Sequence, residues 1–267
     1  MEMQRQDSAR LIDHLVSKID AAPFFEAPFA HLTLAEFFPS DIYDAMLHAM
    51  PRGADYQALP GRNNVNLMPD GSSTRVKIDL FPELIRRLPA AQREIWYTVS
   101  AALCSAEVRD AFMHRLAPGL ARRFGAQHKA VGMYPIPVLT RDVSGYRIPP
   151  HTDTHWKGIT VQLYLPANDA HAGIGTIFHG CEADGKLTNV RRMPFTPNSG
   201  YAFAVTDVSW HSADKVGDEV TSRDSILLTY FVDDTLLRRV RNRAKRAGNF
   251  LLNEVRTMSR RVKASTR

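Results

Sequence analysis

Two histidines and one aspartate have the spacing that a metal site needs. His151 and Asp153 are separated by one residue, and residues i and i+2 of an extended strand project from the same face, so both side chains can reach a single ion. His211 follows the apolar segment that begins at Tyr201 and can supply a third ligand. Two histidines and one carboxylate on one face leave three positions of an octahedral ion open, as in non-haem iron(II) sites. We therefore predict a metal site formed by His151, Asp153 and His211.

The local pattern leaves two alternatives open. A His-x-Asp triplet occurs by chance in many chains with ten histidines, so the triplet alone does not establish a site. His155 would share the face of His151 and Asp153 if the strand continued. We expect the chain to leave the strand at Thr154, which makes His155 a pocket or surface residue.

A candidate anion site follows the third ligand. Arg223 comes twelve residues after His211 and opens an apolar strand, and its planar guanidinium can pair with a carboxylate through two hydrogen bonds. Ser225 has the same strand parity and can add a hydroxyl donor. An isolated Arg before a strand is more often a surface residue. The order His-x-Asp, His, Arg-x-Ser within one segment is what favours a carboxylate anchor.

The segments around these residues predict a mixed α+β chain. From about 129 to 233, short apolar or alternating segments are separated by turn residues, which is typical of a sandwich or barrel. We expect one domain with a mainly helical N-terminal part (1–128), the β core (129–233) and a basic amphipathic C-terminal helix (234–267). In the N-terminal part the pattern predicts helices at about 1–20, 40–50, 83–104 and 106–124, a strand at 29–34 and a loop at 51–79.

Taken in order, these motifs resemble the 2-oxoglutarate/Fe(II)-dependent dioxygenase superfamily, and within it the prolyl-4-hydroxylase-like branch. The resemblance covers about residues 130–233. Each motif alone is weakly specific, but the ordered set is specific. It implies a double-stranded β-helix, or jelly roll, with N-terminal helices packed on it and the iron near one open end. The motifs are Gly145-Tyr-Arg-Ile-Pro-Pro-His151-Thr-Asp153, Gln162-Leu-Tyr164-Leu, Gly173-Ile-Gly-Thr-Ile-Phe178, Pro197-Asn-Ser-Gly-Tyr, Trp210-His211-Ser and Ser222-Arg223-Asp-Ser-Ile-Leu-Leu-Thr-Tyr-Phe-Val.

The resemblance also implies the cofactors, which are Fe(II), O2 and 2-oxoglutarate as co-substrate. It implies that Tyr164 donates a hydrogen bond to the 2-oxoglutarate carboxylate beside Arg223 and Ser225. A core Tyr on a strand is the competing interpretation. One departure affects this set: the family often has a Tyr about ten residues before the His-x-Asp motif, where this chain has Leu139-Thr-Arg141-Asp. Some co-substrate contacts are therefore not assigned by the resemblance.

The implied activity is hydroxylation of an unactivated C–H bond, with release of succinate and CO2. Asp153 fills the place that related halogenases leave open for a halide, which favours hydroxylation or desaturation over halogenation. A small molecule, amino-acid-like or a natural-product metabolite, is the expected substrate. Two other functions remain open, namely hydroxylation of a protein or peptide side chain and a metal-binding jelly roll without turnover.

The composition is that of an ordinary globular protein. Hydrophobic residues make up 44% of the chain and charged residues 23%. No apolar run approaches the roughly 20 residues that span a membrane, and the N-terminus lacks the apolar block of a signal peptide. The two cysteines, Cys104 and Cys181, are far apart and give no disulfide framework. We therefore expect a reduced, cytoplasmic setting, which suits a ferrous ion.

Positive charge is concentrated at the C-terminus. Residues 238–267 contain eleven Lys or Arg and one acid, a net +10, which leaves −4 on residues 1–237 of a chain whose total is +6. Apolar residues recur there at helical spacing, which predicts an amphipathic helix that packs on the body or pairs with a second copy in a homodimer. Nucleic acid and membranes are not expected as partners. The apolar stripe consists of Leu237, Val240, Ala244, Ala247, Leu251, Val255, Met258 and Val262.

Overall fold

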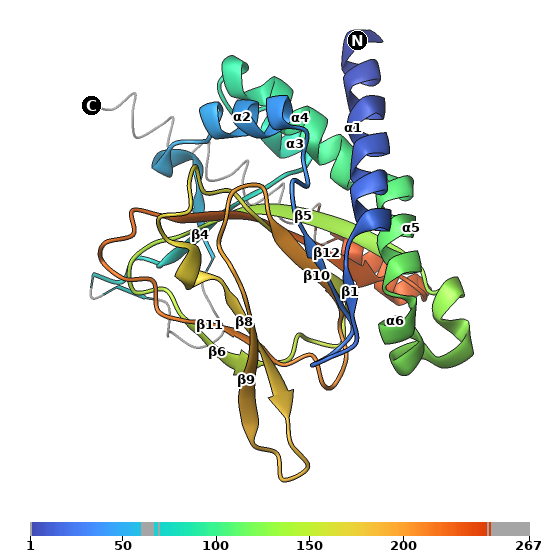
Figure 1. Cartoon of the computed structure of the whole chain (residues 1–267). Coiled ribbons are helices and arrows are strands. Elements are labelled where there is room, and N and C mark those ends of the chain that lie inside the picture. The colour runs from blue at the N-terminus through green and yellow to red at the C-terminus, as the bar shows by residue number, and fades with distance from the viewer. Residues whose placement is uncertain (1, 60–66, 69, 245, 247–267) are drawn as a thin grey trace.

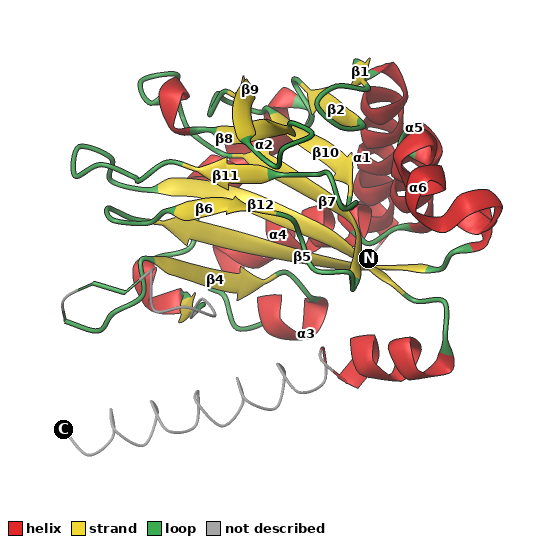
Figure 2. Ribbon diagram, turned by 90° about the horizontal axis from the view of Figure 1, so that it is seen from below, coloured by secondary structure: helices red, strands yellow, loops and turns green. Residues whose placement is uncertain are grey.

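The computed structural model describes residues 2–59, 67–68, 70–244 and 246. Two antiparallel sheets face each other, and helices cover the outer side of the larger one (Figures 1 and 2). The larger sheet has the strand order β1-β2-β10-β7-β12-β5-β4-β3, and the smaller sheet has the order β6-β11-β8-β9. Within the described residues, none of the helices combines the length and apolar character needed to cross a membrane.

The elements follow the chain in the order helices, strands and a short C-terminal helix. The helices are α1 (Glu2–Ala21), α2 (Ser40–His48), α3 (Pro82–Ile85), α4 (Ala90–Leu103), α5 (Ala106–Arg115) and α6 (Ala117–Phe124), and residues 236–244 are also helical. Three 3-10 turns are η1 (Gly53–Asp55), η2 (Gly125–Ala130) and η3 (Ala172–Ile174). The strands are β1 (Phe24–Phe25), β2 (His31–Leu34), β3 (Gln57–Ala58), β4 (Arg75–Asp79), β5 (Met133–Asp142), β6 (Ile148–His151), β7 (Lys157–Tyr164), β8 (Thr176–Cys181), β9 (Leu187–Met193), β10 (Gly200–Ala204), β11 (His211–Ala213) and β12 (Arg223–Val232).

The last eight strands form the jelly roll. β5, β7, β10 and β12 belong to the larger sheet, while β6, β8, β9 and β11 form the smaller one, so the chain passes repeatedly between the two sheets. Strands that cross between two facing sheets in this way are typical of a jelly roll. The predicted α+β jelly roll with helices packed on it is therefore confirmed, and the described strands form two sheets without closing into a barrel.

The central strands of the larger sheet are buried on both faces, because helices cover one face and the smaller sheet covers the other. The face toward the helices is apolar and packs with helical residues such as Leu15, Trp96 and Phe112 in one core. The opposite face, toward the smaller sheet, carries buried polar side chains. Buried polar groups destabilise a fold unless they are paired, so this polar face indicates that a site lies between the sheets. The polar side chains on this face include Thr140, Asp142, Thr160, Gln162, Arg223 and Ser225.

Two expectations about the N-terminal part are wrong. The segment 51–79 was predicted as a loop, but it contains η1, β3 and β4, and β4 pairs with β5. Its Gly, Asn and Pro residues obscured the alternating pattern of Arg75–Asp79. Each of the two long helices is also divided, into α3 and α4 and into α5 and α6, with Pro89 and Pro118 at the new helix starts. Proline lacks the N–H that continues a helix but suits a first turn.

The described part of the C-terminal helix does not bury its apolar stripe. Leu237 is 84% exposed and Val240 is 58% exposed, so these residues do not pack on the body, while the alternative of pairing with a second copy stays a prediction. The contacts with the body are polar instead: Asn242 Nδ2 donates to Val232 O at 3.2 Å, and Arg246 forms an ion pair with Glu83. The stripe from Ala247 to Val262 lies outside the described residues.

Candidate metal centre

His151 and His211 lie side by side because their strands pair. They are direct antiparallel partners in the register of β6 and β11, and their ring centroids are 4.3 Å apart. Asp153 follows two residues after the end of β6. One ligand atom from each of the three residues lies within 4.8 Å of the other two. The structure therefore brings together the three residues that the sequence predicts as metal ligands.

Backbone carbonyls orient both imidazoles. Nδ1 of His151 lies 3.0 Å from Pro149 O, and Nδ1 of His211 lies 3.0 Å from Ser209 O. A carbonyl oxygen can only accept, so each Nδ1 carries a proton and Nε2 is the ring nitrogen left to bind a metal ion. Burial lowers the pKa of His211 to about 4, although the carboxylate of Asp153 acts in the opposite direction. His211 is therefore neutral at neutral pH, as a metal ligand must be.

The third ligand, Asp153, is held ionised by its neighbours. Burial alone would raise its pKa, but the Lys157 ammonium and His211, together with hydrogen bonds from Lys157 and Thr160, hold the pKa well below its usual range. Lys157 Nζ donates to Oδ1 at 2.6 Å, and Thr160 Oγ1 donates to Oδ2 at 2.6 Å. Two imidazoles and one carboxylate fit a divalent iron site.

The metal-ligand residues and Arg223 line one cavity between the sheets, with a volume of about 80 Å³. Arg223 is 2% exposed, and its Nε and Nη1 atoms have no hydrogen-bond partner in the described part of the chain. Its Nη2 donates to Thr176 Oγ1 at 3.4 Å, and its guanidinium carbon lies 5.8 Å from the ring centre of Tyr164. A buried, incompletely bonded guanidinium is costly alone. It fits a bound carboxylate, so the cavity suits a 2-oxo acid with a second carboxylate.

The other two predicted co-substrate residues lie beside this cavity and do not line it. The Tyr164 hydroxyl donates to Thr176 Oγ1 at 2.9 Å and accepts from the Thr176 amide. Ser225 Oγ is within hydrogen-bond distance of Thr140 Oγ1 at 2.9 Å, and it accepts from Gln162 Nε2 at 2.5 Å. In this structure both side chains support residues that do line the cavity, namely Thr176 and Gln162.

Several cavity residues were missed by the sequence reasoning, and three of them have large side chains. Arg75 enters from β4, Tyr201 from β10, and Tyr146 from the turn between β5 and β6. That turn depends on Gly145, whose φ of +88° is a left-handed conformation that favours glycine. Tyr146 stands in the Gly-Tyr motif ahead of His151, which was a usable signal. Arg75 reaches the cavity only through long-range strand pairing, so no local pattern indicated it.

The residues that flank the ligands divide into two groups. Lys157 lines the metal cavity, whereas Trp156 is 37% exposed and lies under the guanidinium of Arg241 at 4.1 Å. His155 is exposed, stacks on Trp156 and lies outside the group of metal ligands, as expected. A second hollow of about 580 Å³ borders the metal site, because Asp153 lines both spaces. Its other lining residues are Arg122, Arg123, Thr152, His155, Val205, Thr206 and Asp207.

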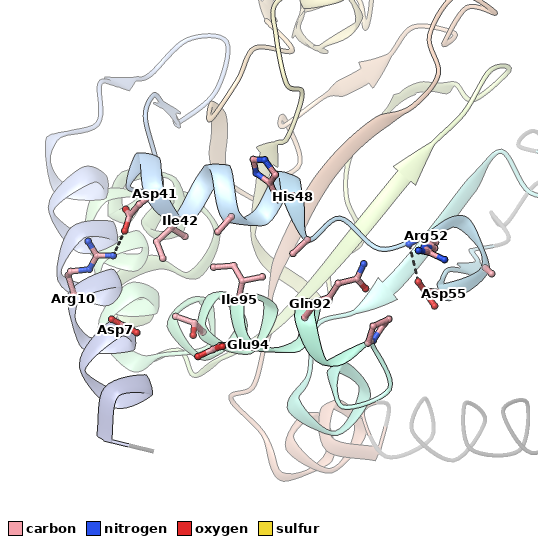
Figure 3. Close-up of a pocket in the computed structure, with 16 residues that line it drawn as sticks. Asp7, Arg10, Asp41, Ile42, His48, Arg52, Asp55, Gln92, Glu94 and Ile95 are labelled. Carbon is pink, nitrogen blue, oxygen red and sulfur yellow. Dashed lines mark hydrogen bonds and ion pairs between the residues drawn. The ribbon is translucent and has the colours of Figure 1, made fainter.

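A larger groove, of about 1000 Å³, lies away from the metal site among α1, α2, α4 and η1 (Figure 3). Several of its charged groups are bonded to each other: Arg10 pairs with Asp41 at 2.6 Å, and the Arg52 amide donates to the Asp55 carboxylate at 2.9 Å. Of the described residues, only the triad of His151, Asp153 and His211 has ligand atoms placed to share an ion. Size therefore does not identify the candidate metal site, which lies at the smaller cavity.

Comparison with solved structures agrees with the topology. A prolyl hydroxylase from Trichoplax adhaerens, in complex with a hypoxia inducible factor oxygen degradation domain peptide fragment, matches with a TM-score of 0.50 and 14% identity, over 87% of this chain and 94% of that chain. A prolyl-4-hydroxylase from Pseudomonas putida matches with a TM-score of 0.49 and 15% identity, over 84% of this chain and 100% of that chain. The 2-oxoglutarate-dependent epimerase SnoN from nogalamycin biosynthesis has a TM-score of 0.42 and 13% identity, over 84% and 86% of the two chains.

No protein-family model and no curated protein matches this chain. At such low identity, likeness to a solved structure shows the fold and leaves activity open. The match to the Trichoplax enzyme supports the same fold for this chain. The chain therefore has the fold of the 2-oxoglutarate/Fe(II)-dependent dioxygenases.

Proposed function

We propose that this protein is an Fe(II)- and 2-oxoglutarate-dependent dioxygenase that hydroxylates a small molecule. The observation that carries the proposal is the shared cavity: a triad suited to iron and a buried, incompletely bonded guanidinium line the same space between the sheets. A metal-binding jelly roll without turnover would need the triad, but it would not need Arg223 facing the same cavity. The fold supports the same reading, since a solved structure that it resembles is a prolyl hydroxylase.

Each part of the cavity has a task in this reaction. His151, His211 and Asp153 would hold Fe(II), and Arg223 would bind the distal carboxylate of 2-oxoglutarate. Bound Fe(II), 2-oxoglutarate and O2 supply the oxidising chemistry: R–H, 2-oxoglutarate and O2 give R–OH, succinate and CO2. Thr160 and Lys157 fix the carboxylate of Asp153, and the two sheets beside the cavity would limit the access of water to the reacting atoms.

A small-molecule substrate is supported by the hollow that shares Asp153 with the metal cavity. Its volume of about 580 Å³ lies within the range of roughly 300–1,000 Å³ that is typical of small-ligand pockets. The alternative is a peptide substrate, and the Trichoplax neighbour was solved with a peptide fragment. A screen of metabolites and of peptides, scored by substrate-stimulated succinate release, separates the two. Stimulation by peptides alone would refute the small-molecule assignment.

The metal and co-substrate assignment has a direct spectroscopic test. Under anaerobic conditions, Fe(II) and 2-oxoglutarate should together give the weak visible charge-transfer band of the chelate. Asp153→Ala removes the only charged ligand, so it should abolish both the band and hydroxylation. The matched control is His155→Ala, which should keep the band, because His155 lies outside the triad. Folded wild-type protein that gives no band would refute the assignment, and hydroxylation by Asp153→Ala at the normal rate would refute the ligand set.

A further inference from the structure

Three charged side chains form a row across three neighbouring strands. In the sheet register, Arg223 of β12 is the direct partner of Asp142 of β5, and Asp142 is in turn the direct partner of Arg75 of β4. Asp142 is 0% exposed and Arg223 is 2% exposed. The row therefore places one buried carboxylate between two guanidiniums, next to the metal cavity.

Of the two guanidiniums beside it, only that of Arg75 hydrogen-bonds to the Asp142 carboxylate. Arg75 Nε donates to Asp142 Oδ1 at 2.5 Å, and Arg75 Nη2 donates to Oδ2 at 2.8 Å. This is a two-point pair of the kind that a planar guanidinium makes best. The guanidinium of Arg75 also stacks on Tyr146, with its central carbon 4.2 Å from the ring centre. Arg75 is therefore held in place from two sides.

Arg223 is close enough to interact electrostatically with Asp142 but does not hydrogen-bond to it. Its Nη1 lies 3.9 Å from Asp142 Oδ2, beyond hydrogen-bond distance. A carboxylate already bound at both oxygens by one guanidinium has little capacity for a second. If Arg75 were absent, Asp142 would be an unpaired buried carboxylate next to an incompletely bonded Arg223, and the two would be strongly attracted.

We propose that Arg75 is a positioning residue: by occupying Asp142, it keeps Arg223 available to bind the anionic end of the co-substrate. The nature of that anion rests on the proposed function, whereas the competition for Asp142 does not. Arg75 lies on β4, outside the eight strands of the jelly roll. A strand that is not part of the jelly roll therefore supplies the residue that keeps Arg223 available. The competing explanation is that Arg75, which also lines the cavity, binds the co-substrate directly.

A crystal structure of Arg75→Gln without 2-oxoglutarate tests the competition itself. We expect the Asp142 carboxylate to lie within hydrogen-bond distance of the Arg223 guanidinium in this variant. The inference is overturned if Asp142 and Arg223 stay apart. This result needs no activity and no co-substrate, so it stands or falls separately from the proposed function.

Calorimetric titration of 2-oxoglutarate into the Mn(II)-loaded protein distinguishes positioning from direct binding. Arg75→Gln should weaken binding at least about tenfold, the ratio expected for losing one charge-assisted hydrogen bond. Asp142→Asn should bind as tightly as wild type or more tightly. The double variant Arg75→Gln/Asp142→Asn should recover to within about threefold of wild type, because Arg223 no longer has a competing carboxylate. A double variant as weak as Arg75→Gln would mean that Arg75 binds the anion itself, and would overturn the inference.

Two controls keep these outcomes separate. Mn(II) affinity should be the same in all four proteins, since the row does not include the triad, and a cooperative unfolding transition in each protein excludes misfolding. Arg75→Lys should lie between wild type and Arg75→Gln, because an ammonium keeps the charge but loses the two-point geometry. If wild type binds Mn(II) but not 2-oxoglutarate, the proposed function is wrong, and the crystal structure of Arg75→Gln alone decides the inference.

Discussion

At the scale of single residues, charged groups in and beside the cavity differ in how completely they are hydrogen-bonded. Asp153 and Asp142 each accept hydrogen bonds from a cation, whereas Nε and Nη1 of Arg223 have no hydrogen-bond partner among the described residues. Such an incompletely bonded buried charge lowers the stability of the folded chain. A site that binds an anion needs this arrangement, because a guanidinium already neutralised by the protein would have little affinity left for a ligand.

Replacing the incompletely bonded guanidinium of Arg223 should therefore weaken 2-oxoglutarate binding without lowering the free energy of unfolding. Arg223→Met keeps a similar side-chain volume and leaves Asp142 paired with Arg75. We expect 2-oxoglutarate binding to weaken by about 1.5–3 kcal/mol, Mn(II) binding to be retained and the free energy of unfolding to stay equal or rise. Calorimetric titration and urea unfolding measure the three quantities.

The matched control for that variant is Arg141→Met on β5. Arg141 lies one residue before Asp142, and its guanidinium pairs with Asp224 at 2.7 Å on the other face of the sheet. Its loss should lower the free energy of unfolding and leave 2-oxoglutarate binding unchanged. Equal 2-oxoglutarate affinity in wild type and Arg223→Met would show that Arg223 is not the anchor.

The histidine ligands predict how the metal-free protein responds to acid. Burial lowers the pKa of His211 to about 4 from an ordinary value of 6.5, so the unfolded chain binds its proton more readily than the folded chain. This contribution is present above pH 6.5 and is lost as the pH falls from 6.5 toward 4. It is on the order of 3 kcal/mol. The pKa of Asp153 is lowered below its ordinary range, so its own contribution is lost only at more acidic pH.

Urea unfolding at several pH values checks this expectation, with His211→Gln as the comparison. The wild-type midpoint should fall between pH 6.5 and 4, and His211→Gln should fall less steeply. The remaining slope has sources of the same sign, since burial also lowers the pKa of His31 and of His179. Parallel curves for the two proteins would contradict the assignment of the acid sensitivity to His211.

At the scale of elements, the parts of the site differ in how far the sequence reveals them. His151 and Asp153 form a short local pattern, and the strand that carries His211 is apolar enough to recognise, so these residues could be predicted. Arg75 could not, because it reaches the cavity only when β4 pairs with β5 across more than sixty residues of chain. The direction of Tyr164 also depended on its partner Thr176, which belongs to the opposite sheet.

The C-terminal helix is tied to the body by a few polar contacts, which makes its deletion informative. Removing residues 240–267 eliminates the bonds from Asn242 to Val232 and the ion pair between Arg246 and Glu83. We expect a lower melting temperature with the iron site retained. If the stripe also joins two copies, Leu237→Ser/Val240→Ser should reduce the mass measured by light scattering without removing those bonds. Unchanged melting temperature and mass after the deletion, with only polyanion or vesicle binding lost, would instead identify the segment as an interaction arm.

At the scale of the whole molecule, the helices and the jelly roll share one core. Leu15 of α1, Trp96 of α4 and Phe112 of α5 belong to the same cluster as Val161 of β7 and Leu228 of β12. Separating the two parts would expose that face of the larger sheet to water, at roughly 25 cal/mol for each Å² of apolar surface. The chain is therefore expected to behave as one folding unit.

Two measurements test this unity. Residues 129–233 produced alone should fail to fold cooperatively, because the helix-facing row of the sheet would be uncovered. In the full chain, a variant that keeps only Trp96 and one that keeps only Trp210 should report the same unfolding midpoint by fluorescence, since one probe lies among the helices and the other beside His211. Distinct midpoints would show that the helical part and the jelly roll unfold separately.

The row Arg223–Asp142–Arg75 also has an evolutionary consequence. A chain that loses Arg75 alone would leave Asp142 free to capture Arg223, and a chain that loses Asp142 alone would leave two buried cations close together. Both single changes carry a penalty that the double change avoids. Among related sequences, positions 75 and 142 should therefore change together, while position 223 remains Arg wherever the co-substrate is used. Positions 75 and 142 lie on different strands, yet they would be conserved or lost as a pair.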